Sequence, residues 1–323
     1  MKKILLISLL VLLGIGIFFY PNAANYFSDK NASKEISNFS RSVSQVDEKI
    51  IADEIKAAQD YNKQLTGEGI RDPFIPGSGI VMGADYKNLL NINNGMMGYI
   101  TIPKIGVNLP IYHGSGDVTL QKGVGHLEGT ALPVGGKSAH TVLTGHSALT
   151  NAKMFTDLTE IKKGDTFYIH IYNEVLAYQV DQVKVVLPSN TEDLMPVLDK
   201  DYVTLITCTP YGINSHRLLV RGGRIPYTPG AEKKAEAAEK TSWWTDDNRR
   251  LAVYASSTAA IMLALILTAV WRRKNSVIRP VSSGVYGNGT PSDVKENTDI
   301  AKMDIDEILK MMDEFLNRKD DRK

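Results

Sequence analysis

The 323-residue sequence predicts a mainly β domain held between two transmembrane helices, and three observations lead to this fold class. Short apolar runs recur between turn residues from Gly98 to Tyr227, without the spacing of β-α-β units. A longer apolar run lies on each side of this region, and amphipathic patterns come before it. We therefore expect a mainly antiparallel barrel or sandwich of about eight strands, preceded by helices.

The first long apolar run, from Ile4 to Tyr20, carries no charge and follows Lys2 and Lys3. As a helix it would be about 25 Å long, which is short for a bilayer core but long for the apolar part of a signal peptide. The residues after Tyr20 make a poor cleavage site. We interpret residues 1–22 as an uncleaved N-terminal membrane anchor.

The second run extends from Leu251 to Trp271 and is followed at once by three basic residues, 272–274. Its length matches the hydrocarbon core of a bilayer, which predicts a transmembrane helix over 251–271. The basic residues beside each run place both termini in the cytoplasm under the positive-inside rule. The prediction is a cell-membrane protein with two spans and an extracellular central domain.

The extracellular part divides into three regions by composition. Residues 33–97 combine amphipathic helical patterns with a Gly- and Pro-rich loop from Gly67 to Gly83. Residues 98–228 form the strand-rich domain and residues 229–250 a linker. Beyond the second span, residues 272–323 form a cytoplasmic tail. The expected strands are 99–102, 109–112, 140–144, 166–172, 176–180, 183–187, 203–208 and 217–221.

The candidate chemistry begins with the only cysteine, Cys208, at the end of the run 203–208. A single cysteine cannot form an intramolecular disulfide, and an unpaired thiol outside the cell is a candidate nucleophile. Alternate residues of a strand share a face, so pairing with the next strand would let Cys208 and Arg217 point into one groove. A buried, structural thiol is the alternative.

A cysteine nucleophile needs a lowered pKa or a nearby base, and histidine is the usual partner. His140 and His170 fall inside strand runs and are expected to be structural, while His216 lies on the strand face opposite Arg217. His146 follows the end of the strand 140–144, where a loop-borne catalytic group would be placed. A Cys/His/Arg set suits acyl transfer, with thiolate attack, protonation of the leaving amine and stabilisation of the oxyanion.

Composition argues against two classes of function. The net charge is +1 and no basic patch is interleaved with aromatic residues, so we expect no nucleic-acid partner. No cluster of His, Cys and Asp has the spacing of metal ligands, so we expect no metal and no cofactor.

The motifs around these residues resemble those of the sortases, the cysteine transpeptidases of Gram-positive cell surfaces. They are the segment 204–208 (TLITC), Arg217 nine residues later and the segment 143–147 (LTGHS). Segments 123–130 and 208–222 are similar to class C, the pilin-polymerising group. The resemblance covers about residues 35–228 and the two anchors. It implies a barrel of about eight strands with Cys208 as nucleophile, His146 as acid/base and Arg217 as stabiliser.

Class C sortases also carry an N-terminal lid with an Asp-Pro-aromatic motif, and Asp72-Pro73-Phe74 resembles that motif. The resemblance implies that Asp72 pairs with Arg217 and that Phe74 covers Cys208. Such a lid would protect an extracellular thiolate from oxidation and from water. The alternative is that Asp-Pro simply opens a turn.

The function implied is cleavage of an LPXTG-like sorting signal between Thr and Gly, through a thioester on Cys208, and transfer of the pilin to a lysine amine of the next pilin. The expected partners are pilin or surface-protein substrates and the lipid membrane. Three alternatives remain open. They are a sortase that anchors proteins to peptidoglycan, a hydrolytic cysteine protease and a non-catalytic, two-span surface binding protein.

Overall fold

The protein is seen in a computed structural model that describes residues 2–65, 67, 69–75, 83–92, 95–242 and 256. Five α-helices are described: α1 Lys2–Val43, α2 Glu48–Asn62, α3 Ala84–Asn88, α4 Asp117–Leu120 and α5 Ala231–Ser242. Three short 3-10 helices accompany them: η1 Pro103–Ile105, η2 Thr156–Glu160 and η3 Glu192–Leu194. The predicted tail, 272–323, lies outside the described residues.

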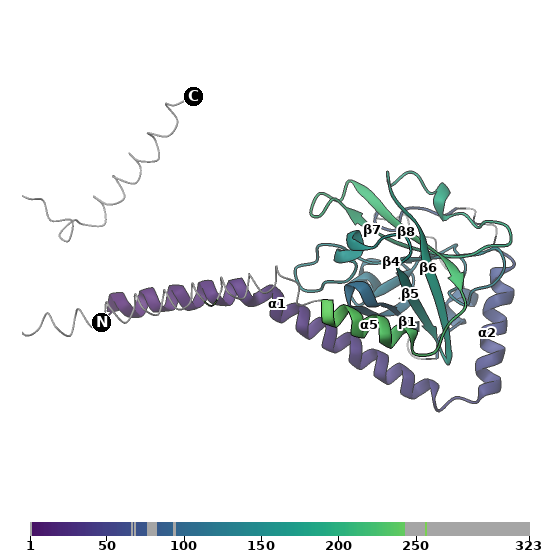
Figure 1. Cartoon of the computed structure of the whole chain (residues 1–323), viewed down its shortest axis with the longest axis horizontal. Helices are drawn as coiled ribbons and strands as arrows, with labels where there is room; N and C mark the ends of the chain where they lie inside the picture. The colour runs from purple at the N-terminus through teal and green to yellow at the C-terminus, as the bar shows by residue number, and fades with distance from the viewer. Residues whose placement is uncertain are drawn as a thin grey trace, which may run out of the picture. The chain divides into compact units, whose positions relative to one another are not determined.

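Eight strands close into a barrel in the order β1-β2-β3-β4-β7-β8-β6-β5 (Figure 1). Two neighbouring pairs, β2 with β3 and β4 with β7, are parallel, and the others are antiparallel. The mainly β fold class and the eight-stranded barrel are thereby confirmed. The strands are β1 Met96–Ile102, β2 Val107–His113, β3 Val124–His126, β4 Ala139–Thr144, β5 Thr166–Ile171, β6 Glu174–Val186, β7 Asp201–Thr209 and β8 His216–Ile225.

Two details of the strand prediction are wrong. The runs 176–180 and 183–187 belong to one strand, β6, whose pairing with β8 shifts register between Val180 and Gln182. The short strand β3 was not expected, because glycine is rare in strands. Gly125 is needed there, since a Cβ at this position would lie 2.4 Å from the carbonyl oxygen of Gly114.

Alternation along the strands separates an inner core from an outer apolar cluster. Leu143 of β4, Leu205 of β7 and Leu218 of β8 belong to the main core. Their neighbours Val142, Ile206 and Leu219 face the other side. There they form a second apolar cluster with Ile70, Leu127, Val186 and Leu194. This outer face of β4, β7 and β8 carries the candidate site.

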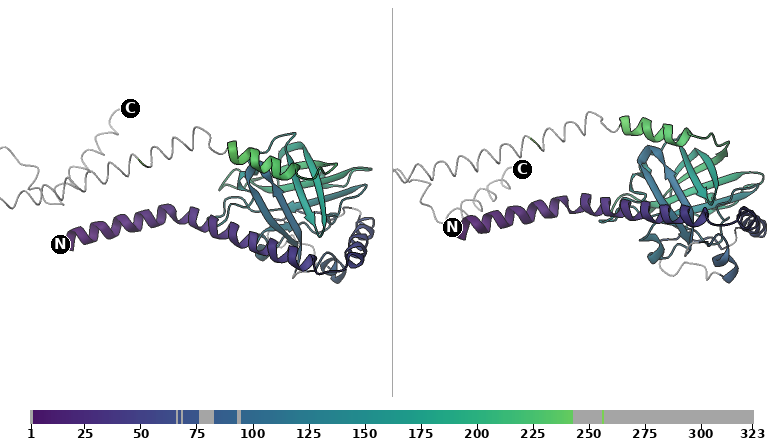
Figure 2. Two further views of the ribbon diagram at one scale, coloured as in Figure 1. Left: turned by 60° about the horizontal axis from the view of Figure 1, so that its bottom comes forward. Right: turned by 90° about the horizontal axis from the view of Figure 1, so that it is seen from below.

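The first two helices pack on the barrel through apolar residues at helical spacing. Ile36, Phe39 and Val43 of α1 are buried, as are Ile51 and Ile55 of α2. Phe39 stacks on Tyr172 of the barrel, with ring centroids 6.2 Å apart. Figure 2 shows the barrel end of α1 running along the barrel wall.

Residues 231–242 of the predicted linker 229–250 form the helix α5. Glu232 of this helix hydrogen-bonds Thr101 and lies 3.1 Å from Nε2 of His170. The His170 ring in turn stacks on Tyr99, with centroids 4.1 Å apart. These contacts fix α5 to strands β1 and β5 and show why His170 is structural.

The two predicted transmembrane helices are not supported by the structure. In the part of the chain that it describes, no helix combines the length and the apolar character needed to cross a membrane. Of the second predicted span, 251–271, only Ser256 is among the described residues.

The packing of α1 gives a first prediction. Phe39→Ala should lower the free energy of unfolding by about 3 to 5 kcal/mol, because it removes a buried ring and leaves a cavity. Chemical denaturation followed by circular dichroism measures this loss. Lys34→Ala, on the exposed side of the same helix, is the control and should change stability little. Equal stability of the Phe39 variant and the wild type would show that α1 does not pack on the barrel.

Candidate active site

Strand pairing brings three of the predicted site residues into one row. Cys208 of β7 is the direct partner of Arg217 in the antiparallel neighbour β8. On its other side β7 runs parallel to β4, with Thr144 opposite Ile206. His146 and Cys208 each follow these partners by two residues, so His146 lies just beyond the end of β4 and Cys208 near the end of β7. Adjacent strands are about 4.8 Å apart, so Cys208 and Arg217 lie side by side, and the loop with His146 follows β4 on the other side of β7.

Three hydrogen bonds hold the histidine loop against β7 beyond the end of β4. The Gly145 N–H donates to the carbonyl oxygen of Ile206 at 3.1 Å. The Thr207 hydroxyl donates to the carbonyl oxygen of Gly145 at 2.7 Å. The Ser147 hydroxyl donates to the carbonyl oxygen of Cys208 at 2.7 Å. The backbone on both sides of His146 is therefore tied to the strand that carries the thiol.

The Arg217 guanidinium is buried and uses its donors within the protein. Nε and Nη2 donate to the two carboxylate oxygens of Asp72 at 2.6 and 2.9 Å. Nη1 donates to the carbonyl oxygens of Asn214 and His216, both at 3.0 Å. Asp72 is only 4% exposed and Arg217 only 5%. This two-point ion pair joins the N-terminal loop to the row.

Phe74 lies over the row, between the histidine and the arginine. Its ring centroid is 5.8 Å from that of His146 and 5.1 Å from the Cζ of Arg217. Its N–H donates to Asp72 at 2.9 Å, which closes the turn through Pro73. Phe74 also packs against the outer apolar cluster. The segment Asp72-Pro73-Phe74 thus contacts two members of the row.

The loop that carries this segment is anchored to the barrel before and after it. The Asn62 amide donates to the carbonyl oxygen of Leu132 and accepts from its N–H, at 3.0 and 2.7 Å. The Tyr86 hydroxyl lies 2.7 Å from Nδ1 of His126 and accepts from the Gly114 N–H at 3.2 Å. We use "lid" for the described residues 70–75 of this loop. These contacts attach the chain before and after the lid to the barrel.

The environment of the row keeps both reactive groups in their neutral forms. Burial raises the pKa of the Cys208 thiol, the Arg217 charge opposes this and the Asp72 charge adds to it. Burial also lowers the pKa of His146, and the charge of Asp117 partly opposes it. With the lid in place at neutral pH, the pair is a thiol and an uncharged imidazole.

The other histidines are occupied by structural contacts. His140 contacts the carbonyl oxygen of Met195 and the hydroxyl of Thr204, both at 2.8 Å. Burial lowers the pKa of His126 to about 4. His113 contacts the carbonyl oxygens of Leu89 and Gly95, and His216 contacts Ser215. Among the six histidines, all of which the structure describes, His146 is the one whose loop is tied to Cys208, through the neighbouring Ser147.

Sequence reasoning missed two residues of this site. Asp117, at the start of α4, is the carboxylate whose charge acts on His146, and no motif connects the two. Ser147 ties the histidine loop to Cys208. Its position next to His146 was the only available signal. Among the described residues, no group of three or more His, Cys, Asp or Glu side chains could hold a metal ion.

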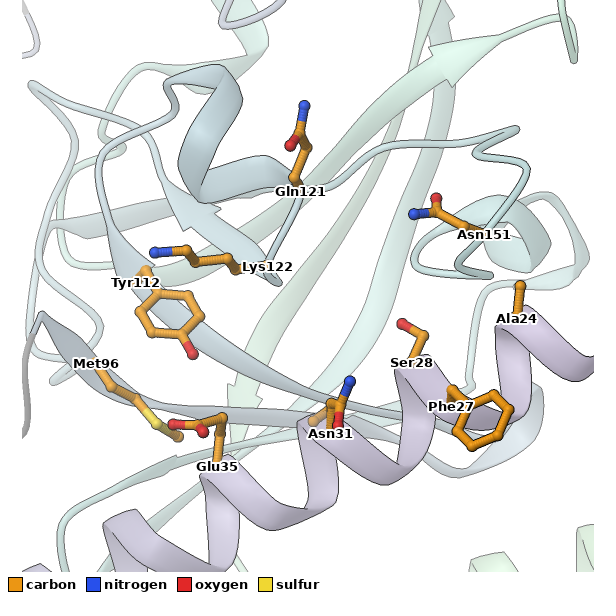
Figure 3. Close-up of a pocket in the computed structure, with 11 residues that line it drawn as sticks. Ala24, Phe27, Ser28, Asn31, Glu35, Met96, Tyr112, Gln121, Lys122 and Asn151 are labelled. Carbon is orange, nitrogen blue, oxygen red and sulfur yellow. The ribbon is translucent and has the colours of Figure 1, made fainter.

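A groove of about 630 Å³ lies between α1 and the barrel, apart from the row (Figure 3). Helix α1 lines it with Ser28, Asn31 and Glu35, and Tyr112 and Lys122 face them from the barrel side. None of Cys208, His146 and Arg217 lines this groove.

Comparisons with known proteins agree on one family. The model of the sortase domain matches residues 100–225. Sortase C-1 from Streptococcus pneumoniae is 47% identical, with a TM-score of 0.54, over 60% of this chain and 100% of that one. The pilus-related sortase C of Group B Streptococcus is 46% identical, with a TM-score of 0.56, over 59% of this chain and 97% of that one.

A more distant relative is sortase A of Streptococcus agalactiae, which is 26% identical over 211 residues. That match covers 64% of this chain and 77% of the relative. The class C structures are thus considerably more similar to this chain than this sortase A is. The chain belongs to the sortase family of cysteine transpeptidases, and within that family to class C.

Proposed function

We propose that the protein polymerises pilins. Cys208 cleaves an LPXTG-like sorting signal between Thr and Gly, holds the pilin as a thioester and passes it to a lysine amine of the next pilin. The observation that carries this proposal is the row of His146, Cys208 and Arg217 beneath a lid bound to Arg217. The similarity to a pilus-related sortase C supports it.

The first half of the reaction forms the thioester. After the lid moves, His146 takes the thiol proton and Cys208 attacks the threonine carbonyl of the signal. The Arg217 guanidinium, released from Asp72, stabilises the oxyanion that develops on that carbonyl. Imidazolium then protonates the departing glycine amine, and the peptide bond breaks.

The second half transfers the pilin and restores the enzyme. The lysine amine attacks the thioester carbonyl and gives its proton to His146, so that an isopeptide bond forms and Cys208 leaves as thiolate. The thiolate recovers a proton from the imidazolium. The same two groups therefore act in both halves, and no proton is gained or lost over the cycle.

The lid suits an enzyme that must avoid hydrolysis between substrates. Arg217 cannot bind Asp72 at two points and stabilise an oxyanion at the same time, so lid closure and catalysis compete for one guanidinium. The uncharged thiol under the lid is also the less reactive form of cysteine. We infer that substrate binding requires the lid to leave the row.

The membrane location is part of the same proposal and rests on the sequence. Two spans and an extracellular domain would keep the enzyme beside pilins that are tethered to the membrane before transfer. Fractionation of cells that produce the full chain tests this, with protease added to intact protoplasts. Protection of the domain from protease would contradict an extracellular location.

Thioester formation gives the first functional prediction. Incubation with an LPXTG-containing peptide should add the mass of the acyl fragment to the wild type, and Cys208→Ala should show no adduct while keeping the same circular dichroism spectrum. Intact-protein mass spectrometry measures both. Acyl transfer that persists in Cys208→Ala would exclude thiol catalysis. With purified pilin, a lysine-linked dimer rather than a peptidoglycan-linked product would separate polymerisation from wall anchoring.

Removal of the lid side chains gives the second functional prediction. Asp72→Ala combined with Phe74→Ala should speed the reaction of Cys208 with a small thiol reagent about tenfold or more, because each ~1.4 kcal/mol lost from lid closure corresponds to a factor of ten. The rate of labelling under excess reagent is the measurement. Asp60→Ala, an exposed carboxylate on α2, is the control. An unchanged rate in the double variant would mean that the loop does not limit access.

The pH dependence of Cys208 labelling by the thiol reagent gives the third functional prediction. Because burial and Asp72 raise the pKa of Cys208, wild-type labelling should rise with a midpoint above the ordinary cysteine pKa of about 8.5. In the double variant, water reaches the thiol and Arg217 keeps its charge without Asp72, so the midpoint should move to lower pH. A midpoint that stays constant or rises would contradict the stated causes of the shift.

A further inference from the structure

One buried side chain on the catalytic face has no assigned role. The Thr144 hydroxyl is fully buried, yet it has no hydrogen-bond partner in the part of the chain that the structure describes. Buried hydroxyls are almost always bonded, since burial without a partner costs free energy. A residue of this kind needs a physical explanation.

The neighbouring buried threonines show that this is not a general property of the region. The Thr130 hydroxyl donates to the carbonyl oxygen of Leu127, and that of Thr141 to the carbonyl oxygen of Leu132. Thr207 is bonded to Gly145, and Thr204 contacts His140. Only the threonine next to the histidine loop is left without a partner among these five.

Thr144 lies on the outer face, in the row next to the catalytic one. Its direct partner in β7 is Ile206, whose partner in β8 is Leu219. Cys208 is two residues beyond Ile206, which corresponds to about 7 Å along the strand. Thr144 itself is two residues before His146. The Thr144 hydroxyl therefore lies in the cross-strand row next to that of Cys208, the proposed nucleophile.

The lid covers this part of the face. Phe74 contacts His146 at one end of the row and Arg217 at the other, and it packs against the cluster that contains Val142, Ile206 and Leu219. Thr144 shares the outer face of β4 with Val142 and is the last residue of that strand, two residues before His146. Departure of the lid would expose the apolar cluster beside this hydroxyl.

We propose that the Thr144 hydroxyl binds a backbone amide group of the sorting-signal peptide, near the carbonyl that Cys208 attacks. An extended peptide offers N–H and C=O groups, and a hydroxyl can donate to one or accept from the other. The closed lid leaves the hydroxyl unpaired, whereas the bound peptide satisfies it. The residue thus favours the exchange of lid for substrate. This inference rests on the proposed function.

The test compares Thr144→Val, which keeps the shape but removes the hydroxyl, with Thr144→Ser, which keeps the hydroxyl. For Thr144→Val we expect an unfolding midpoint equal to or above that of the wild type, because no hydrogen bond is lost. We expect kcat/KM for acyl-enzyme formation with an LPXTG peptide to fall about tenfold, mainly through KM. Thr144→Ser should retain kcat/KM within about threefold.

A matched control uses the same strand. The Thr141 hydroxyl is bonded to Leu132, so Thr141→Val should lower the unfolding midpoint and leave kcat/KM unchanged. A second comparison repeats Thr144→Val in the variant without Asp72 and Phe74. In that background the loss in kcat/KM should persist, because the hydroxyl binds the peptide and does not act through the lid.

Two outcomes would overturn the inference. One is an unchanged kcat/KM in Thr144→Val. The other is a lowered unfolding midpoint for that variant, which would mean that the hydroxyl already has a partner in the free protein. If the wild type itself forms no acyl-enzyme with the peptide, the proposed function fails, and this inference fails with it.

Discussion

The arrangement of the site depends on the position of strand β7, which pairs in parallel with β4 and antiparallel with β8. The parallel pairing makes β4 and β7 end at the same edge of the barrel, so that the loop after β4 delivers His146 beside Cys208. Strand β8 follows β7 directly in the chain and pairs with it in the antiparallel direction, which places Arg217 opposite Cys208. These two pairings together bring the three residues of the proposed catalytic set to one edge of the barrel.

The lid uses the same row as its binding site. The Asp72–Arg217 pair is buried, and its strength depends on removal of water from both groups. Phe74 supplies that exclusion of water by lying over Arg217 and His146. Burial raises the pKa of Cys208 and lowers that of His146. In the proposed function, this burial and the lid both keep the cysteine in its less reactive form.

The two faces of the sheet have different tasks. The inner face is filled by apolar side chains and gives the barrel its stability. The outer face combines a smaller apolar cluster with the row of His146, Cys208 and Arg217, and Phe74 of the lid packs against that cluster. The chain is held to the barrel at Asn62 and Tyr86, before and after the lid. The proposed role of Thr144 agrees with this division, because a substrate that replaces the lid would bond the unpaired hydroxyl.

Much of the site could be predicted from the sequence, because its signals are local. The alternation of side chains along strands predicted that Cys208 and Arg217 point into one groove. The end of the predicted strand placed His146 in a loop. The resemblance of motifs identified Asp72 and Phe74. For the fold, seven of the eight strands were expected, although one was divided in two.

Only the tertiary structure decided the remaining features, since each joins segments far apart in the chain. Asp72 and Arg217 are 145 positions apart, and they meet because the N-terminal loop packs on the outer face of the barrel. The short strand β3, the contact of α5 with His170 and the charge of Asp117 near His146 likewise depend on tertiary packing. The sequence by itself determined which residues share a strand face, because side-chain direction alternates locally. Which strands become neighbours, and which hydroxyl stays unpaired, depended on long-range packing that no local pattern encodes.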